Sequence, residues 1–540
     1  MRRLMMAVMF SLGCALLALP LAAQRGPSAK WDTAGGDAQL TGWQHVEPRI
    51  TAANVPEMKL LWKLKLGDGV GGGLAPTEPL FTGRMITEAG FKDAAYVLLP
   101  GNNVYAVDYE LGRLMWSKHF DVQNSPAQAC PNGQFAAFII QPLPTFTFGR
   151  RGAPGRGGAA AGRGAAAPAP RPEPPPEPAA RVAFASTGGG FRMRGIFVLT
   201  SDGYLHELRT ANGADYGEPV KFLPYQDSNL SDPTVAGDTM YVATSGECGG
   251  QMQPNGVWKP EPNGVWSVDA KTADYPVNSH ATGVNATGLD GPAQSTDGKT
   301  LYQTTGSGNQ GAHPDGVLAL DAATLEVKDY YTPASDPAGG PAIDVSPAVF
   351  QLNGKDIIAA YDADGRLVLL DSASLGGADH HTPLAQSAPL TTRGPAAWGR
   401  LATAELNGTR WIYVAVHGPV AAGLHLASTH GAAPNGSIVA FKVAGSGSAL
   451  TLTPAWQSAN LDDPSPAVIA SGHVFVLANG GSGHDARLDA FDATTGASSY
   501  SSGAQITSPA NRSSIALDAG HILFVTDDNT LYSFGIGILH

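Results

Sequence analysis

The side chains best suited to metal, redox or acid–base chemistry, those of cysteine and histidine, are few and widely spaced in this chain. No Cys-x-x-Cys-His segment is present, so nothing indicates a covalently attached c-type haem. The histidines, including the adjacent His380 and His381, lack the spacing to a carboxylate or cysteine partner that a zinc site requires. We expect them to be solvated or loop residues. Most of the plausible chemistry lies between Leu301 and His381, in a stretch that holds two consecutive copies of a repeat.

The N-terminus has the pattern of a secretory signal. Residues 1–23 combine two arginines, a long apolar run and a closing pair of alanines. We expect a signal peptide over residues 1–23, a periplasmic or secreted mature protein, and no membrane span after cleavage. A retained membrane anchor is the alternative, although Gly13 and Pro20 interrupt the run. Removing the signal leaves Cys130 and Cys248 in an oxidising compartment, where we expect a disulfide between them.

One strand pattern recurs through the chain and predicts the fold. Each copy is a short apolar strand that ends near a polar residue and is followed by a turn, which is typical of buried strands in a meander. The eight copies are Val104–Asp108, Tyr204–Leu208, Val265–Asp269, Val317–Asp321, Leu367–Asp371, Ile438–Lys442, Leu488–Asp492 and Leu531–Phe534. Most spacings are near the roughly 40 to 50 residues of a four-stranded propeller blade. The pattern therefore predicts an all-β, eight-bladed β-propeller of four-stranded antiparallel blades, formed as a single domain by residues 31–540.

Two further features support the propeller. Leu60–Leu66 reads as an extra N-terminal strand, and we expect it to complete the last blade and close the ring. Asp297-Gly298 and Asp364-Gly365 supply residues that tolerate the positive φ of tight hairpins.

Composition separates one segment from the propeller and limits the possible partners. Residues 149–181 are rich in Pro, Gly, Ala and Arg and lack hydrophobic periodicity, so we expect a disordered insertion whose removal leaves the fold intact. Its arginines could bind an acidic ligand, but a solvated insertion is the simpler interpretation. With 540 residues and 43% apolar content, the chain can bury a large core. A formal charge of −12 argues against nucleic acid and against an anionic membrane surface.

A short duplication lies in the middle of the chain. Pro254–Trp258 and Pro262–Trp266 have the same sequence, PNGVW. The second copy overlaps the recurring strand, and we expect the first to form a loop. Trp258 could line a pocket, although packing on the propeller face is the simpler interpretation.

The repeat ending also resembles that of a known family. Ala490–Gly496 follows the pattern Ala-x-Asp-x-x-Thr-Gly, which resembles the repeat of the pyrroloquinoline quinone (PQQ) propellers in the quinoprotein alcohol dehydrogenase-like superfamily. Trp31–Asp37 and Ile50–Val55 look like the opening of those enzymes, and Arg410–Val414 and Asn529–Gly535 look like later blades. The resemblance covers nearly the whole mature chain.

The resemblance implies a site on the propeller axis. In that family PQQ lies over a calcium ion that takes oxygen ligands from a Glu and an Asn, and an Asp is the general base. Glu247 and Asn309 stand where the two ligands would be expected, and Asp344 is the nearest match for the base, with Asp336 as its rival. Without a cofactor, Glu247 would be a turn acid, Asn309 a positive-φ loop residue and Asp344 a strand-end cap.

Several positions depart from the family pattern. Cys248 stands next to Gly249, where the family has two adjacent cysteines. Residues 283–308 contain no tryptophan to stack under the quinone, and Ala363 occupies the position of an expected basic residue. Losing a stacking face and a cation would weaken binding of a polyanionic ring.

Two functions therefore remain open. The first is a PQQ- and calcium-dependent dehydrogenase that oxidises a small alcohol or sugar and passes electrons to a separate acceptor. The second is a non-catalytic propeller scaffold that binds a protein or glycan partner. The fold is the same in both cases.

Overall fold

The computed structural model describes residues 31–67, 76–87, 90–122, 136–140, 195–236, 238–245, 248–269, 275–282, 287, 290–306, 313–334, 344–391, 397–481 and 483–537. The predicted signal peptide and the insertion at residues 149–181 lie outside these ranges, so both stay predictions. None of the helices in these ranges has the length and apolar character that a membrane crossing requires.

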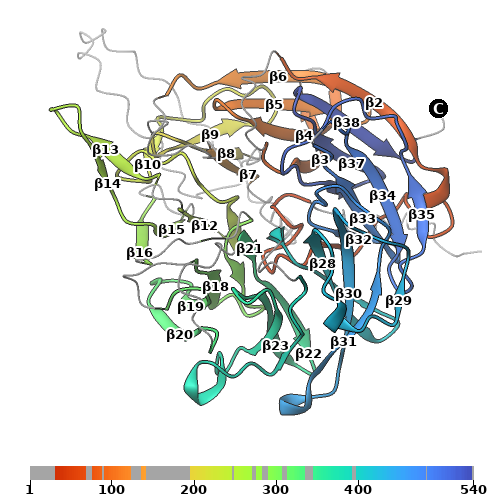
Figure 1. Cartoon of the computed structure of the whole chain (residues 1–540). Helices are drawn as coiled ribbons and strands as arrows, with labels where there is room; N and C mark the ends of the chain where they lie inside the picture. Colours follow the sequence, from red (N-terminus) through yellow and green to blue (C-terminus); the bar gives the residue numbers. More distant parts are fainter. Residues whose placement is uncertain are drawn as a thin grey trace, which may run out of the picture.

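Eight blades surround a common axis (Figure 1), which confirms the predicted all-β propeller. Within the described ranges, the strands of each blade are, from the axis outwards, as follows. Blade 1 has β3 (Leu80–Thr87), β4 (Gly90–Leu99), β5 (Asn103–Asp108) and β6 (Arg113–His119); blade 2 has β7 (Ala136–Ile140), β8 (Gly195–Thr200), β9 (Tyr204–Arg209) and β10 (Val220–Lys221). Blade 3 has β11 (Thr234–Ala236), β12 (Thr239–Ala243), β15 (Gly264–Asp269) and β16 (Val277–Ala281); blade 4 has β17 (Ala293–Gln294), β18 (Thr300–Thr304), β19 (Val317–Asp321) and β20 (Val327–Tyr331). Blade 5 has β22 (Ala348–Leu352), β23 (Lys355–Tyr361), β24 (Leu367–Asp371) and β25 (Ala385–Gln386); blade 6 has β27 (Ala402–Leu406), β28 (Thr409–His417), β30 (Gly436–Ala444), β31 (Thr451–Gln457) and β29 (Ser428–Thr429). Blade 7 has β1 (Trp43–Gln44), β32 (Val468–Ala470), β33 (His473–Ala478), β34 (Arg487–Asp492) and β35 (Ser498–Ser501); blade 8 has β36 (Ala516–Asp518), β37 (His521–Val525), β38 (Thr530–Gly535) and β2 (Lys59–Lys65).

Shorter elements lie in the connections within and between the blades. The paired strands β13 (Gly250–Met252) and β14 (Trp258–Pro260) form one hairpin, and β21 (Asp344–Ser346) pairs in parallel with β26 (Trp398–Arg400). The described 3-10 helices are η1 (Val55–Glu57), η2 (Gly377–Asp379), η3 (Ala422–Leu424) and η4 (Gly447–Ala449).

The recurring sequence pattern corresponds to one strand position. Each of its eight copies overlaps the third strand from the axis of its blade, counting blade 7 from β32 because β1 belongs to the N-terminal segment, and Val317–Asp321 and Leu367–Asp371 coincide with β19 and β24. Gly298 and Gly365 have φ values of 75° and 74° in the hairpin turns before β18 and β24. The turn prediction from the Asp-Gly pairs is therefore confirmed.

The predicted closing strand is also confirmed. β2 pairs antiparallel with β38, with Leu64 opposite Leu531, so the N-terminal strand becomes the outer strand of the last blade. This pairing joins two ends of the chain and closes the ring.

Tryptophan rings fasten three junctions between neighbouring blades. In each case the ring lies on a turn glycine of the next blade; the pairs are Trp62 with Gly112, Trp116 with Gly213 and Trp456 with Gly496. Each indole N–H donates to a backbone carbonyl of the same turn at 2.7–3.1 Å. The glycines have φ values of 61–76°, and an added Cβ would lie 2.5–2.6 Å from the ring. Only glycine fits, which explains the last residue of the recurring turn motif.

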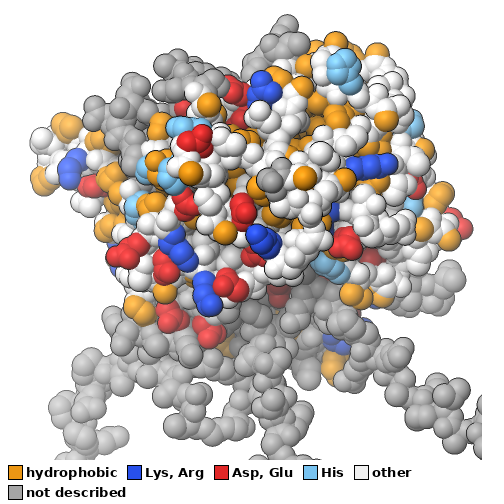
Figure 2. Space-filling model, turned by 90° about the horizontal axis from the view of Figure 1, so that it is seen from below, with side chains coloured by type: hydrophobic (Ala, Val, Ile, Leu, Met, Phe, Trp, Pro, Cys, Tyr) orange, Lys and Arg blue, Asp and Glu red, His pale blue; other side chains and the backbone are white. Residues whose placement is uncertain are grey.

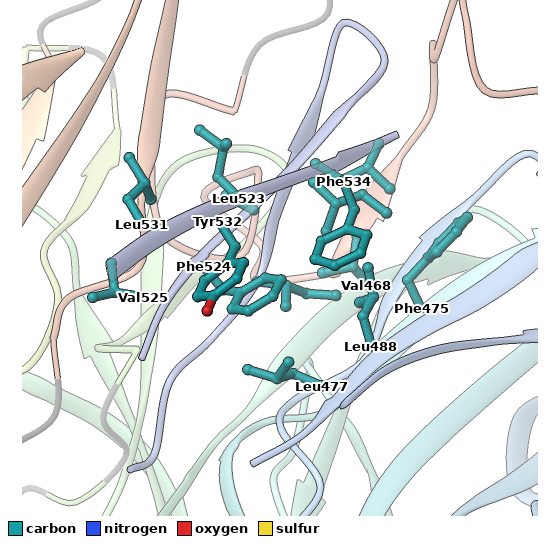
Figure 3. Packing of buried hydrophobic residues seen from close by; sticks show 14 of the residues in the cluster. Val468, Phe475, Leu477, Leu488, Leu523, Phe524, Val525, Leu531, Tyr532 and Phe534 are labelled. Carbon is teal, nitrogen blue, oxygen red and sulfur yellow. The ribbon is translucent and has the colours of Figure 1, made fainter. Parts of the chain in front are cut away.

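Apolar side chains from adjacent blades fill the space between the sheets. Figure 3 shows one such interface, in which Phe475 and Leu477 of blade 7 pack near Phe524, Tyr532 and Phe534 of blade 8. All five are at most 1% exposed. Their burial, at about 1.5–3 kcal/mol for each large apolar side chain, is the main force that holds neighbouring blades together.

The N-terminal segment before β2 crosses the centre of the ring (Figure 1). We call residues 31–44 the axial segment. It hydrogen-bonds to the inner strand, or to the residue just before it, in seven blades through Trp31–Phe81, Thr33–Pro233, Ala38–Gln294, Gln39–Val349, Thr41–Thr403, Gly42–Ile469 and Gln44–Leu517. A single extended segment thereby joins the blades from the inside.

The first copy of the duplicated PNGVW sequence forms a loop, as predicted. Its first four residues make the turn of the β13–β14 hairpin, which projects beyond the ring in Figure 1, and Trp258 is the first residue of β14. Gly256 has a φ of 78°, and the Asn255 side chain accepts the Val257 N–H at 3.1 Å. Asn-Gly is a strong hairpin signal, and it decided the local structure here.

Charged side chains on the face shown in Figure 2 are mixed in sign. Lys and Arg lie beside Asp and Glu, with hydrophobic side chains scattered between them. On the described part of that face, the charges therefore form no continuous basic patch of the kind that nucleic acid requires.

Candidate functional site

The predicted site residues are only partly placed. Glu247, Asn309 and Asp336 lie outside the described residues, and their convergence stays a prediction. Asp344 begins β21, and its backbone pairs with Trp398 of β26. Its position in the ring is thereby fixed between blades 4 and 6, but its side chain lies outside the described part of the structure.

Cys248 is buried, at 3% exposure, and is disulfide-bonded. Cys130 lies outside the described residues, so the pairing of these two cysteines stays a prediction. The glycines that follow Cys248 are needed for close packing, since a Cβ on Gly249 would lie 2.6 Å from the Tyr225 ring and one on Gly250 would lie 2.6 Å from the Trp258 ring.

A buried group of charges lies at the ring centre, and the sequence did not predict it. We call Glu78, Asp290 and Arg400 the axial ion cluster. Arg400 Nη1 lies 2.6 Å from Glu78 Oε2 and 3.0 Å from Asp290 Oδ1. The side chains of Arg400 and Glu78 are 0% exposed and that of Asp290 is 3% exposed. Water is therefore largely excluded from both ion pairs.

Three blades and the axial segment position this cluster. Glu78 precedes β3 of blade 1, Asp290 precedes β17 of blade 4, and Arg400 ends β26 just before blade 6. The axial segment completes it, because Trp31 Nε1 donates to Glu78 Oε1 at 2.5 Å and the Gly35 N–H donates to the same oxygen at 3.1 Å. The cluster therefore joins distant parts of the ring through one arginine.

Burial and mutual attraction set the charge states. Burial raises the pKa of Glu78 and Asp290, while the Arg400 guanidinium opposes that rise in pKa. Burial lowers the pKa of Arg400, but the two carboxylates more than offset this, so its pKa lies above the ordinary value. A third acid, Asp232, has a pKa well above its usual range because of burial and the neighbouring Asp290 and Glu78. Among the described residues, Arg400 is thus surrounded by three buried acids, Glu78, Asp290 and Asp232.

Several polar atoms of this region have no hydrogen-bond partner among the described residues. They are Nε and Nη2 of Arg400, Nε1 of Trp398 and Oδ2 of Asp290. Trp398 and Arg400 are two residues apart on β26, on either side of Gly399, which has a φ of 79°. Buried donors of this kind normally bind ordered water or a ligand.

The described residues fit PQQ poorly. A polyanionic ring needs free cations, but the Arg400 guanidinium already binds two carboxylates and is outnumbered by the three acids around it. No group of three or more His, Cys, Asp or Glu side chains within the described ranges is placed to hold a metal ion, and the predicted calcium ligands Glu247 and Asn309 lie outside those ranges.

The chain itself contained a signal for the axial acids that sequence reasoning missed. Glu78-Pro79, Asp232-Pro233 and Asp290-Gly291-Pro292 place an acid and a proline directly before the inner strands of blades 1, 3 and 4. Aligning the blades on their inner strands would have brought these acids together at the axis. Arg400 has no such pattern and could not have been found in this way.

No family model and no curated protein matches the chain. Solved structures with a similar fold include the quinohemoprotein alcohol dehydrogenase of Comamonas testosteroni and that of Pseudomonas putida HK5, each with a TM-score of 0.56 and 13% identity over 95% of this chain and 81% of the other. A europium-containing methanol dehydrogenase matches with a TM-score of 0.54 and 13% identity over 94% of this chain and 98% of the other. The chain therefore has the propeller fold of the quinoprotein alcohol dehydrogenases.

Proposed function

We propose that this chain is a periplasmic or secreted binding propeller, which uses the quinoprotein fold as a scaffold for a protein or glycan partner and does not turn over PQQ. The observation that carries the proposal is the axial ion cluster. Its one arginine is already committed to Glu78 and Asp290 inside a region with a third acid.

Electrostatics make this cluster a poor site for a multiply charged anion. Freeing Arg400 for a ligand would leave two buried carboxylates without their partner, which costs about 3–5 kcal/mol when a buried pair is broken. The sequence departures act in the same direction, because Ala363 supplies no cation and residues 283–308 supply no tryptophan for stacking.

A dehydrogenase is the second candidate, and one observation favours it. Nε and Nη2 of Arg400 and Nε1 of Trp398 are donors without a partner among the described residues, and an anionic cofactor could accept from them. On this view Glu247 and Asn309 would hold calcium and Asp344 would accept the proton from an alcohol or sugar, with a separate electron acceptor. PQQ with calcium would supply a quinone that takes up two electrons.

PQQ binding distinguishes the two candidates directly. The mature chain, incubated with PQQ and calcium and then dialysed, should retain no stoichiometric quinone absorbance and should not reduce an artificial dye with alcohols or sugars. Retention of one PQQ per chain that requires calcium and is lost in Glu247→Ala would overturn the proposal. Glu326→Ala, an exposed acid in the turn before β20, is the matched control.

A further inference from the structure

A cavity of about 280 Å³ lies in the outer half of blade 3, beside the projecting hairpin and away from the ring axis. Pockets for drug-sized ligands measure roughly 300–1,000 Å³, so this one suits a single ring-sized unit. The residues that decide its chemistry are Tyr225, Gln251, Glu261, Trp266, Ser279 and His280.

Three separate segments build the cavity. β15 and β16 supply Trp266 and Ser279, which are direct cross-strand neighbours. The connection after β10 supplies Tyr225, and the β13–β14 hairpin supplies Gln251 at its base.

Hydrogen bonds fasten these segments to one another. Gln226 and Gly250 exchange two backbone hydrogen bonds of 3.1 and 2.9 Å, and Tyr225 Oη donates to the Pro262 carbonyl at 3.3 Å. The Glu261 N–H also donates to the Gly249 carbonyl at 2.9 Å. The cavity is therefore formed before a ligand arrives, which lowers the entropy cost of binding.

Two aromatic rings give the cavity apolar walls. The Tyr225 and Trp266 ring centroids are 5.7 Å apart, and their planes meet at 83°. Tyr225 is only 5% exposed, so its ring is held rigidly by its surroundings. Rigid aromatic surfaces bind the apolar C–H faces of a ligand at low entropic cost.

The polar lining is nearly neutral. The Glu261 carboxylate lies 3.0 Å from Lys259 Nζ, so its charge is compensated. Burial lowers the pKa of His280, which keeps the imidazole neutral at pH 7. Gln251 and Ser279 add uncharged donors and acceptors on the exposed side. The charge on Glu261 is already paired with Lys259, whereas a neutral polyhydroxyl ligand would find both donors and acceptors.

We infer that this cavity binds one neutral sugar unit, with the sugar's C–H face on the aromatic walls and its hydroxyl groups bonded to Gln251, Glu261 and Ser279. The inference rests on the proposed binding function and names a glycan as the partner. The site shares no residue with the axial ion cluster, so the two can be tested independently.

Titration with the neutral methyl glycosides of glucose, galactose, mannose and N-acetylglucosamine, followed by calorimetry and ligand-detected NMR, tests the site. At least one should bind saturably, and Gln251→Ala should weaken it by about tenfold or more. Gln253→Ala, on the same hairpin but outside the cavity lining, should leave binding unchanged. Trp266→Phe should also weaken binding, with thermal unfolding monitored to confirm that the variant is folded.

Three results would overturn the inference: no saturable binding up to tens of millimolar, binding unaffected by Gln251→Ala, or preference for glucuronate or glucosamine over the neutral glycosides. Measuring PQQ retention in parallel distinguishes failure of the sugar site from failure of the proposed binding function. Sugar binding with PQQ retention would leave this site standing and remove the scaffold proposal, while absence of both would remove only the sugar site.

Discussion

Replacing Arg400 with methionine tests whether the axial ion cluster fastens the ring. The substitution keeps an unbranched side chain but removes the charge that Glu78 and Asp290 share. Removing one partner of a buried ion pair costs about 3–5 kcal/mol, because it leaves uncompensated buried charge. We expect a loss of this size at neutral pH, which is a large part of the stability of most domains.

The loss should depend on pH in a definite direction. Burial already raises the pKa of Glu78 and Asp290, and removing the guanidinium raises each pKa further. Carboxyls with a raised folded-state pKa hold protons that the unfolded chain has released, so stability falls as pH rises above about 4. The deficit of Arg400→Met should therefore be larger at pH 8 than at pH 5.

Urea unfolding at both pH values, followed by tryptophan fluorescence and circular dichroism, measures the effect. The control is the triple variant Arg400→Met, Glu78→Gln, Asp290→Asn, which should recover most of the stability because neither former partner of the guanidinium is then a buried, unpaired carboxylate. Gln at position 78 still offers an oxygen to Trp31 and Gly35. A deficit that is the same at pH 5 and pH 8, or a triple variant as unstable as the single one, would refute the reasoning.

Three further predictions test the blades. Gly496→Ala and Gly472→Ala both place a Cβ at a φ of 76°, but only the Cβ at position 496 meets a ring, that of Trp456 at 2.6 Å. In urea unfolding, Gly496→Ala should therefore lower the free energy of unfolding by about 1–3 kcal/mol more than Gly472→Ala does. Equal losses would contradict the docking role of the Trp456 ring. Burial raises the pKa of Asp227 from 3.8 to about 8, so the stability of the wild-type protein should fall between pH 4 and pH 8. Asp227→Asn should make the free energy of unfolding depend less steeply on pH in this range. The same pH dependence in both proteins would exclude this carboxyl as the cause. Leu64→Asp places a carboxylate in the partly buried closing strand and should lower stability by about 2 kcal/mol or more. Lys59→Asp, at an exposed position of the same strand, should leave stability nearly unchanged. Thermal unfolding of both variants measures the difference.

The sequence predicted what depends on local pattern. The copies ending at Asp321 and Asp371 define their strands to the residue, because a short continuous apolar run and the turn that bounds it act within a few positions. The closing strand at Leu60–Leu66 was predicted nearly as well, and the structure has it as Lys59–Lys65. An apolar strand pattern interrupted by Lys63 and Lys65, lying outside the eight repeats, favoured a strand that completes one of the blades.

Long-range contacts were beyond such reasoning. Arg400 and Glu78 are separated by 322 residues, and nothing near Arg400 in the chain marks it as a buried ion-pair partner. The axial segment is similar, since residues 31–44 have little periodicity and take their conformation from bonds to seven inner strands. Of the predicted site, only the backbone of Asp344 is placed, because Glu247 and Asn309 fall outside the described residues.

The central cluster and the outer cavity differ in how tightly the fold constrains them. Arg400, Glu78 and Asp290 are each joined to another blade, so a substitution there disturbs the ring itself. The exposed Gln251 lies on a hairpin that projects beyond the ring, and a change there alters only one wall of a cavity. Substitutions at the outer cavity can therefore change which ligand it binds while the ring stays intact. A cofactor at the axis would instead have to fit among the contacts that hold the blades together.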